Sequence, residues 1–279
     1  MKYIYLNLKR FDVPASRGGV NRGDIEHWAR TIIRGTQPIN AFRDATFAVF
    51  LPEAHLLPAL GTARDTGSVM HIGCQSVYRD DVAPGVNFGA FTSNRPAQAM
   101  AAMGVDYTII GHCEERRDKL GILAEAGVND SAAVSRILNK QVRAAIGAGL
   151  NVLYCVGETS EEQPRRYDVL AEQLTLGLAG LELDGRDAGK VTLAYEPVWA
   201  IGPGKTPPDA AYIGDIARFI KGQVTLPVVY GGGLKSDNAA MLAGIPEIDG
   251  GLIALTRFSG EIGFYPDEYL EIVRLYLGA

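Results

Sequence analysis

The stretch NVLYCVGETSEEQPRRYDVLAEQLTLGLAGLELDGRDAGKVTLAYE (151–196) holds two short apolar runs separated by a longer amphipathic one. The runs NVLYCVG (151–157) and VTLAYE (191–196) are continuously apolar, which is typical of strands buried on both faces of a parallel sheet. Between them, apolar residues recur with the period of a helix. These residues are Tyr167, Leu170, Leu174 and Leu178. The stretch therefore predicts a strand–helix–strand unit.

Six further short apolar runs lie on either side of this unit. They are YIYLNL (3–8), TFAVFL (46–51), MHIGCQ (70–75), DYTII (106–110), LPVVYG (226–231) and GLIAL (251–255). In the helical stretches between runs, Asp130 is placed to cap one helix, Gly222 to stop another and Pro266 to open the last. Eight strand-like runs that alternate with helical or loop sequence predict a barrel or a doubly wound sheet. Periodicity alone does not choose between the two.

Composition is that of an ordinary globular protein and disfavours several classes. The 279 residues suit one large domain, with 47% hydrophobic and 21% charged residues. The net charge is −5 and no basic block is longer than a pair, which argues against a nucleic-acid surface or a polybasic membrane anchor. No apolar run approaches the roughly 18 residues of a membrane span, and the first apolar stretch is too short for a signal peptide.

The cysteines and the polar stretches give two further expectations. Cys74, Cys113 and Cys155 are odd in number and form no Cys-x-x-Cys pair, so they predict no disulfide framework or structural zinc site and favour a cytoplasmic location. Residues 10–24 are rich in polar and turn-forming residues and predict an extended loop after the first strand. A second long loop is expected over residues 76–96.

Chemically capable side chains stand where three of the predicted strands end. Lys9, His112 and Glu196 each follow an apolar run, and in parallel folds the carboxyl ends of strands meet at one edge where ligands bind. A carboxylate can abstract a proton next to a carbonyl, while an imidazole and an ammonium stabilise the charge that develops on oxygen. Each residue also has a structural interpretation, as an ion-paired glutamate, a satisfied histidine or a solvated lysine.

Two nucleotide-binding patterns are incomplete. Gly204-Lys205-Thr206 resembles the end of a phosphate-binding P-loop, but Trp199 stands where its first glycine is required. The dinucleotide pattern G-x-G-x-x-G is also absent around Gly202 and Gly204. A nucleotide is therefore not the expected ligand.

Longer motifs carry a resemblance to a known family. The segments AYEPVWAIGPGK (194–205), YTIIGHCEERR (107–117) and Asn7-Leu8-Lys9 resemble motifs of triosephosphate isomerases, and shorter matches follow in order from the first strand to the last. The resemblance implies a single (β/α)8 barrel domain over residues 1–279. It also implies an aldose–ketose isomerase of glycolysis and gluconeogenesis that interconverts dihydroxyacetone phosphate and glyceraldehyde 3-phosphate through an enediolate, without a metal or cofactor.

The resemblance assigns roles residue by residue. Glu196 is the implied base, His112 the electrophile and Lys9 the electrostatic residue, with Asn7 beside it in the pocket. Residues 197–205 are the implied active-site lid, with stiff Pro197 at one end and Gly202-Pro203-Gly204 at the other.

The remaining implied contacts lie around these groups. They are the backbone N–H of Gly202 to the substrate phosphate, Glu114 beside the lysine, Cys155 near the base, and Thr92, which reaches the active site of a second copy. For Cys155 we favour a packing role. Thr92 implies a homodimer.

The phosphate end departs from the family pattern. Gly233 replaces a serine, while Ala254 and Leu255 replace two glycines that let the main chain approach the phosphate. All three are nevertheless expected at the substrate. Arg257 replaces a small serine and is either a substitute phosphate contact or a residue that faces solvent or pairs with Glu261.

Changes elsewhere leave undecided which substrate the sequence predicts. Cys113 replaces a serine, and Glu115 stands where an arginine is usual and reverses one charge. Together with the long first loop, these changes leave two alternatives to the triose phosphate reaction. One is isomerisation of a related sugar phosphate such as a tetrulose phosphate, and the other is a non-catalytic protein that binds a phosphorylated metabolite.

Overall fold

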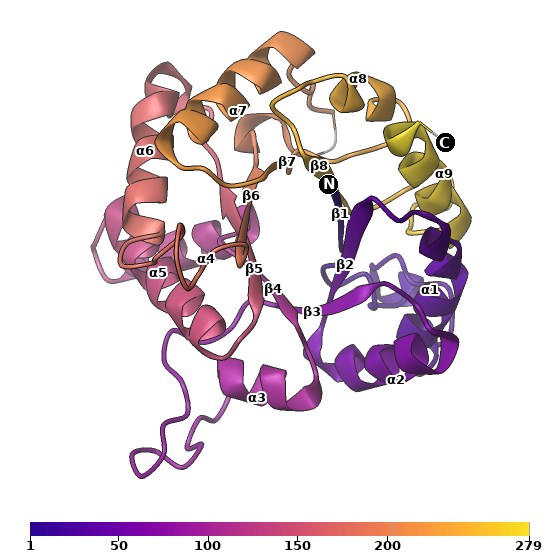
Figure 1. Cartoon of the computed structure of the whole chain (residues 1–279), viewed down its shortest axis with the longest axis horizontal. Helices are drawn as coiled ribbons and strands as arrows, with labels where there is room; N and C mark the ends of the chain where they lie inside the picture. Colours follow the sequence, from indigo (N-terminus) through magenta and orange to yellow (C-terminus); the bar gives the residue numbers. More distant parts are fainter. Residues whose placement is uncertain (203, 279) are drawn as a thin grey trace.

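Eight parallel strands close into a barrel in chain order (Figure 1). The computed structural model describes residues 1–202 and 204–278. The strands are β1 (Lys2–Asn7), β2 (Ala45–Leu51), β3 (His71–Gln75), β4 (Tyr107–Ile110), β5 (Asn151–Val156), β6 (Val191–Tyr195), β7 (Val228–Tyr230) and β8 (Gly250–Ile253). The barrel closes where Tyr3 of β1 lies opposite Gly250 of β8 and Leu6 opposite Ile253. This pairing decides between the two predicted sheets, and the (β/α)8 barrel is confirmed.

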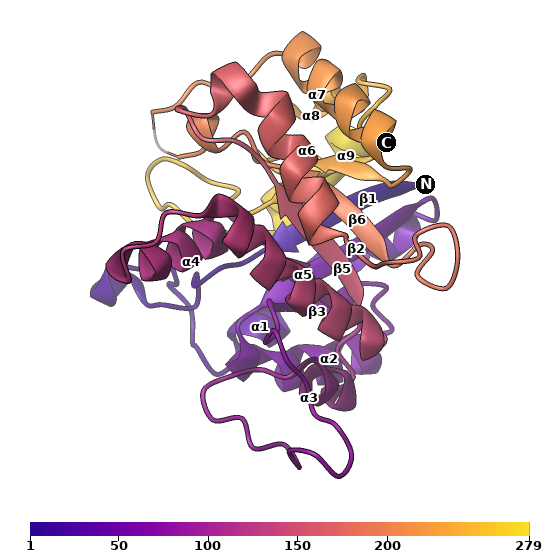
Figure 2. The ribbon, with the colours of Figure 1, turned by 90° about the vertical axis from the view of Figure 1, so that its left-hand side faces the viewer.

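Helices surround the barrel (Figures 1 and 2). They are α1 (Trp28–Thr36), α2 (Leu56–Thr66), α3 (Ala97–Met103), α4 (Cys113–Glu125), α5 (Ser131–Gly147), α6 (Arg166–Gly177), α7 (Ala210–Gln223), α8 (Ala239–Ala243) and α9 (Pro266–Leu277). In the described ranges, none is long and apolar enough to cross a membrane.

Two of the three predicted helix signals are confirmed. The side chain of Asp130 caps α5 by accepting the N–H of Ala133 at 2.9 Å, and Pro266 is the first residue of α9. The stop predicted at Gly222 falls one residue before the end of α7 at Gln223. Glycine lowers helix propensity, but the buried apolar face of α7 packs against the barrel and outweighs that local preference.

The apolar residues form two cores. One fills the barrel, and the other packs the outward faces of the strands against the helices. The barrel interior holds Tyr5, Ala48, Phe50, Ile109, Leu153, Cys155, Ala194, Val229 and Leu252. Because both faces of each strand are covered, the strands are apolar throughout, as the sequence indicates.

Gly157 places the end of β5 against the end of β6. The N–H of Glu196 donates to the carbonyl of Val156 at 2.8 Å, which brings the Glu196 backbone beside Gly157. A Cβ on residue 157 would lie 1.8 Å from the Glu196 carbonyl oxygen. Only glycine permits this approach, so the position of Glu196 depends on a residue that carries no chemistry itself.

Two long loops leave the barrel at the carboxyl ends of its strands. In the first, over residues 10–24, buried Asp12 accepts hydrogen bonds from Arg10 and lies 3.3 Å from Nε2 of His55. The second, over residues 76–96, projects from the body between β3 and α3 (Figures 1 and 2). In the predicted lid, Pro203 lies outside the described residues, as does Ala279 at the end of the predicted domain.

We expect Gly157→Ala to lower the free energy of unfolding by about 1–3 kcal/mol, because the added methyl group meets backbone that cannot rotate away. Chemical denaturation measures the change. Gly61→Ala is the control, since Gly61 lies within α2 with open space at its Cβ position, and alanine there is expected to stabilise by about 0.5–1 kcal/mol. Equal stabilities for the two variants would contradict the predicted contact.

Candidate active site

His112 follows β4 and is the N-cap residue of α4. Its Nδ1 accepts the backbone N–H of Glu114 at 3.3 Å. A neutral imidazole carries one proton, so with Nδ1 as acceptor the proton lies on Nε2. Nε2 faces Glu196 and lies 3.2 Å from its Oε1. The fold therefore presents an N–H donor from the end of β4 to the middle of the site.

Glu196 follows β6 and is 1% exposed. Its Oε2 accepts the backbone N–H of Cys113 at 2.8 Å, at the start of α4. Its Oε1 has no hydrogen-bond donor in the part of the chain that the structure describes, because His112 Nε2 is near it without hydrogen-bond geometry. Buried carboxylate oxygens normally have a donor, so this one is available to a proton from a bound molecule.

Lys9 follows β1 and completes the predicted trio. Its ammonium lies 2.8 Å from Oε1 of Glu114, and its backbone N–H donates to Oδ1 of buried Asn7 at 3.0 Å. Partial burial alone would raise the pKa of Glu114, but the hydrogen bond and charge of Lys9 hold that pKa below its ordinary value. The backbone of Lys9 has φ of +41°, and Gln75 steadies it by donating to its carbonyl at 2.8 Å.

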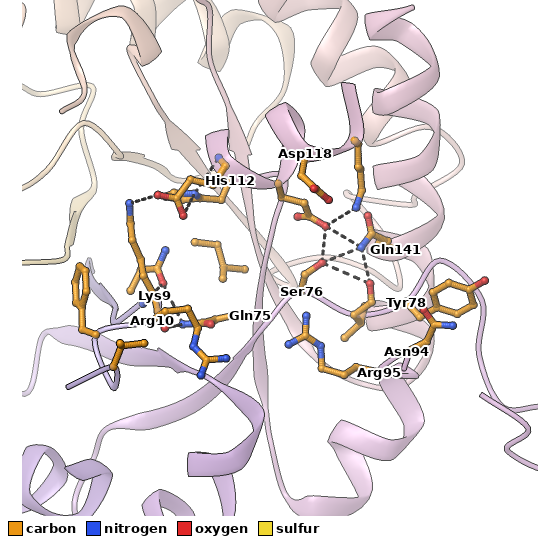
Figure 3. A pocket seen from close by; sticks show the side chains of 18 of the residues that line it. Lys9, Arg10, Gln75, Ser76, Tyr78, Asn94, Arg95, His112, Asp118 and Gln141 are labelled. Carbon is orange, nitrogen blue, oxygen red and sulfur yellow. Dashed lines mark hydrogen bonds and ion pairs between the residues drawn. The ribbon is translucent and has the colours of Figure 1, made fainter. Parts of the chain in front are cut away.

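A cavity of about 790 Å³ opens beside Lys9 and His112 (Figure 3), and Glu196 does not line it. Lys9 and His112 line it together with Gln75, the long first loop and residues 93–95. Side chains from the ends of β1, β3 and β4 point into it (Figure 3). The cavity is larger than a small polar molecule requires.

A sequence profile of the triosephosphate isomerase family matches residues 22–273. The chain belongs to the triosephosphate isomerase family. A triosephosphate isomerase of Solibacter usitatus is 36% identical over 215 residues, which cover 72% of this chain and 77% of that protein. One of Geobacter metallireducens is 38% identical over 176 residues, and the match covers 59% of this chain and 64% of the relative, a little under two thirds.

The solved structures add the likeness in fold. The crystal structure of triosephosphate isomerase from Bartonella henselae superposes with a TM-score of 0.71, covers 99% of both chains and is 24% identical in sequence. It supports the barrel and, at that identity, nothing about individual residues.

The predicted phosphate contacts lie on the loops after β7 and β8. Beyond β8 the chain passes Ala254 and Leu255, both half-buried, and forms a short bridge in which Arg257 pairs with Gly263. No helix begins in the described chain between β8 and Pro266. On the neighbouring loop Gly233 has φ of +101°, and Asn238 donates to its carbonyl at 2.9 Å. The predicted substrate contacts of Gly233, Ala254 and Leu255 stay predictions.

Arg257 contacts α9 in this structure. Its Nε donates to Oε1 of Glu268 at 2.7 Å, and its guanidinium stacks 3.8 Å from the ring centroid of Tyr265. The alternative pairing with Glu261 is not seen, since that carboxylate lies 3.8 Å from Nε of Arg22. Arg257 would have to leave Glu268 to bind a phosphate, so the geometry favours a role in holding the bridge to the first turn of α9.

The predicted lid over residues 197–205 begins against Glu158, a glutamate that is not among the predicted site residues. Glu158 is fully buried at the end of β5, and its Oε1 accepts Trp199 Nε1 of the lid at 2.8 Å. The hydroxyls of Tyr195 and Tyr212 donate to the same oxygen at 2.9 and 3.1 Å. Burial raises the pKa of Glu158. A strand-end glutamate is visible in the sequence, but its three donors come from residues 37 to 54 positions away.

The remaining predicted residues are Cys155, Gly202 and Thr92. Cys155 is fully buried inside the barrel, where burial raises the pKa of its thiol well above the ordinary value, which suits packing. Gly202 is exposed and lines a second cavity of about 580 Å³, which Lys9 also lines. Thr92 is exposed on the loop over residues 76–96 and does not line the 790 Å³ cavity of its own chain.

Three ligand-type atoms meet in the site, from His112, Cys113 and Glu196, all within 4.8 Å of one another. A metal would bind Cys113 as a thiolate. Burial, with the nearby charge of Glu196, raises the pKa of the Cys113 thiol to about 12. In the absence of a metal ion the Cys113 thiol is therefore protonated at neutral pH.

The raised pKa of Glu158 predicts a pH-dependent stability. Below the ordinary carboxyl pKa both folded and unfolded chains are protonated, but above the raised pKa the folded state holds a costly buried charge. Glu158→Gln lacks this ionisation. We expect its free energy of unfolding, relative to the unaltered chain, to rise in urea titrations as the pH passes from the ordinary carboxyl pKa through the raised one.

Glu247→Gln is a control of opposite sign. The hydrogen bond and charge of Arg218 lower the pKa of Glu247, so that its contribution to stability is present above the ordinary pKa and lost as the pH falls. Relative stability of this variant should therefore fall as the pH rises. The same trend in both variants would refute the assignment for Glu158.

Proposed function

We propose that this chain interconverts dihydroxyacetone phosphate and glyceraldehyde 3-phosphate by proton transfer through an enediolate. The observation that carries the proposal is the buried Oε1 of Glu196, which lacks a donor among the described residues and faces Nε2 of His112. A base without a competing donor, opposite an N–H group, suits removal of a proton beside a carbonyl. Membership of the triosephosphate isomerase family supports the substrate.

Each step balances within the residues of the site. Glu196 takes the proton from the hydroxyl-bearing carbon next to the carbonyl, and the electron pair of the broken C–H bond forms the C=C bond. The carbonyl π electrons move to oxygen, where His112 donates a hydrogen bond and Lys9 supplies positive charge. His112 Nε2 then gives its proton to this oxygen and takes the proton of the neighbouring hydroxyl, so that the new C=O bond forms on the oxygen that lost its proton. The electron pair of the C=C bond takes the proton back from Glu196 at the adjacent carbon. No electrons leave the substrate, so the step requires neither an oxidant nor a reductant.

Asn7 and Glu114 are the proposed partners of Lys9, because Asn7 accepts its backbone N–H and Glu114 pairs with its ammonium. The side chain of Glu114, which is ion-paired with Lys9, is 50% exposed. Such exposed pairs are weak, so a substrate phosphate can compete for the ammonium. The lid over residues 197–205 would close over the substrate and bring the backbone of Gly202 to its phosphate.

Exposed apolar side chains support a homodimer. Phe88 and Val86 are 86% and 74% exposed at the projecting loop over residues 76–96, which also carries Thr92. Large apolar side chains exposed together commonly mark an interaction site. The loop of one copy would enter the cavity beside Lys9 and His112 of the other. With three free cysteines and this family, we place the protein in the cytoplasm.

Neither alternative function is favoured. The relatives compared are triosephosphate isomerases, which gives a tetrulose phosphate no support. A protein that only binds a metabolite has no need of a buried base opposite a histidine. A coupled assay with dihydroxyacetone phosphate, run beside erythrulose phosphates on one preparation, tests the proposal. Efficient conversion of the triose supports it, and conversion of the tetrulose alone would overturn the substrate.

We expect Glu196→Asp to lower kcat by roughly a hundredfold or more, because the shorter side chain retracts the carboxylate from the substrate carbon. The melting temperature should change little, since Asp keeps the negative charge and removes only one methylene group. Steady-state kinetics and a thermal melt on the same sample measure both. Unchanged turnover in this variant would remove Glu196 from the reaction.

A further inference from the structure

Glu115 joins the ends of β3 and β4 through one carboxylate. Its Oε2 accepts the backbone N–H of Gly111 at 2.7 Å. Its Oε1 accepts the Ser76 hydroxyl at 2.7 Å and Nε2 of Gln141 at 2.9 Å, and the Lys119 ammonium lies 3.0 Å away. Four donors therefore converge on two oxygens of a side chain that is 16% exposed.

The bond to Gly111 acts on the histidine of the site. Gly111 directly precedes His112 and has φ of +79°. Arg116 holds the other side of this residue by donating its Nε to the Gly111 carbonyl at 3.0 Å. With both its N–H and its C=O bound, Gly111 has little freedom to rotate. The direction in which the chain enters His112 is thereby fixed.

The bond to Ser76 acts on the lysine of the site. Ser76 has φ of +70°, a conformation that costs free energy in a residue with a side chain. The preceding residue, Gln75, donates its side-chain amide to the carbonyl of Lys9 at 2.8 Å. Gln141 adds a bond to the Ser76 hydroxyl at 2.8 Å. The Glu115 carboxylate thus stabilises the strained turn from which Gln75 reaches Lys9.

We infer that Glu115 is a positioning residue, which aligns His112 and Lys9 with each other through the backbone of Gly111 and the turn at Ser76. The inference rests on the proposed isomerase function. Burial alone would raise the pKa of Glu115, but the charge of Lys119 and the bonds from Ser76 and Gly111 hold it below its ordinary value, so the carboxylate is ionised at neutral pH. The arginine usual at this position in the family has only donors and cannot accept any of the four bonds.

The variant Glu115→Gln tests the inference. An amide keeps one acceptor oxygen and turns an NH2 group toward one of the donors. Because three donors meet at Oε1, we expect the remaining oxygen to stay there and the Gly111 N–H to lose its acceptor. The expected result is a fall in kcat of roughly tenfold to a hundredfold with a change in KM below about threefold, because misalignment acts on the chemical step.

Lys119→Met is the matched control. It removes the ion pair from the same carboxylate but leaves the bonds to Gly111 and Ser76 in place. We expect it to lower the melting temperature while kcat per folded chain stays within about twofold of the unaltered enzyme. An equal loss of kcat in both variants, or an unchanged kcat in Glu115→Gln, would overturn the inference.

Amide hydrogen exchange at Gly111 separates this inference from the proposed function. By NMR, exchange at Gly111 should be at least about tenfold faster in Glu115→Gln and unchanged in Lys119→Met. If the unaltered chain shows no triose isomerisation yet this pattern holds, the proposed function fails and the structural role of Glu115 remains. If Gly111 exchanges at the same rate in all three proteins, the positioning role is refuted whatever the activity.

Discussion

The closure of β1 on β8 is the constraint on which the rest of the structure depends. In a closed parallel barrel every strand ends at the same rim, so Lys9, His112 and Glu196 meet although 187 positions of chain separate the first from the last. The hydrogen bond from Cys113 N–H to Glu196 then crosses the rim from β4 to β6 at 2.8 Å. It holds one carboxylate oxygen and leaves the other free for chemistry.

The two ends of the site differ in how far they keep the family pattern. At the proton-transfer end, the lysine, histidine and glutamate stand where the family motifs place them. At the phosphate end, Leu255 and the bridge between Arg257 and Gly263 replace glycine-rich sequence, and Arg257 is bound to Glu268. The residues proposed for proton transfer and those predicted to hold the phosphate lie at different strand ends, so one set can change while the other is retained.

Much of this account could be predicted from the sequence, and the failures share a cause. Continuous apolar runs and helical stripes depend on local pattern, and so do the cap at Asp130 and the start of α9 at Pro266. The end of α7 depends on how its face packs, which overrides Gly222. The partner of Arg257 depends on the path of a loop, and nothing in the spacing distinguishes Glu268 from Glu261.

The same limit applies to the supporting residues of the site. The charge reversal at Glu115 is visible in the sequence, but its meaning depends on four donors that only the folded chain brings together. Glu158 likewise stands at a strand end, and its contact with the lid tryptophan becomes evident only in three dimensions. Reactive groups follow from motifs, whereas the residues that orient them follow from tertiary contacts.

The measurement that tests the central claim most directly is isomerisation of dihydroxyacetone phosphate in D2O, followed by NMR of the product and of the remaining substrate. Proton transfer through an enediolate by one exchangeable carboxylic acid predicts deuterium on the carbon next to the new carbonyl, and a fall of roughly a hundredfold or more in the rate of this incorporation in Glu196→Asp. Conversion without any deuterium on that carbon, or no conversion and no exchange at all, would contradict the account.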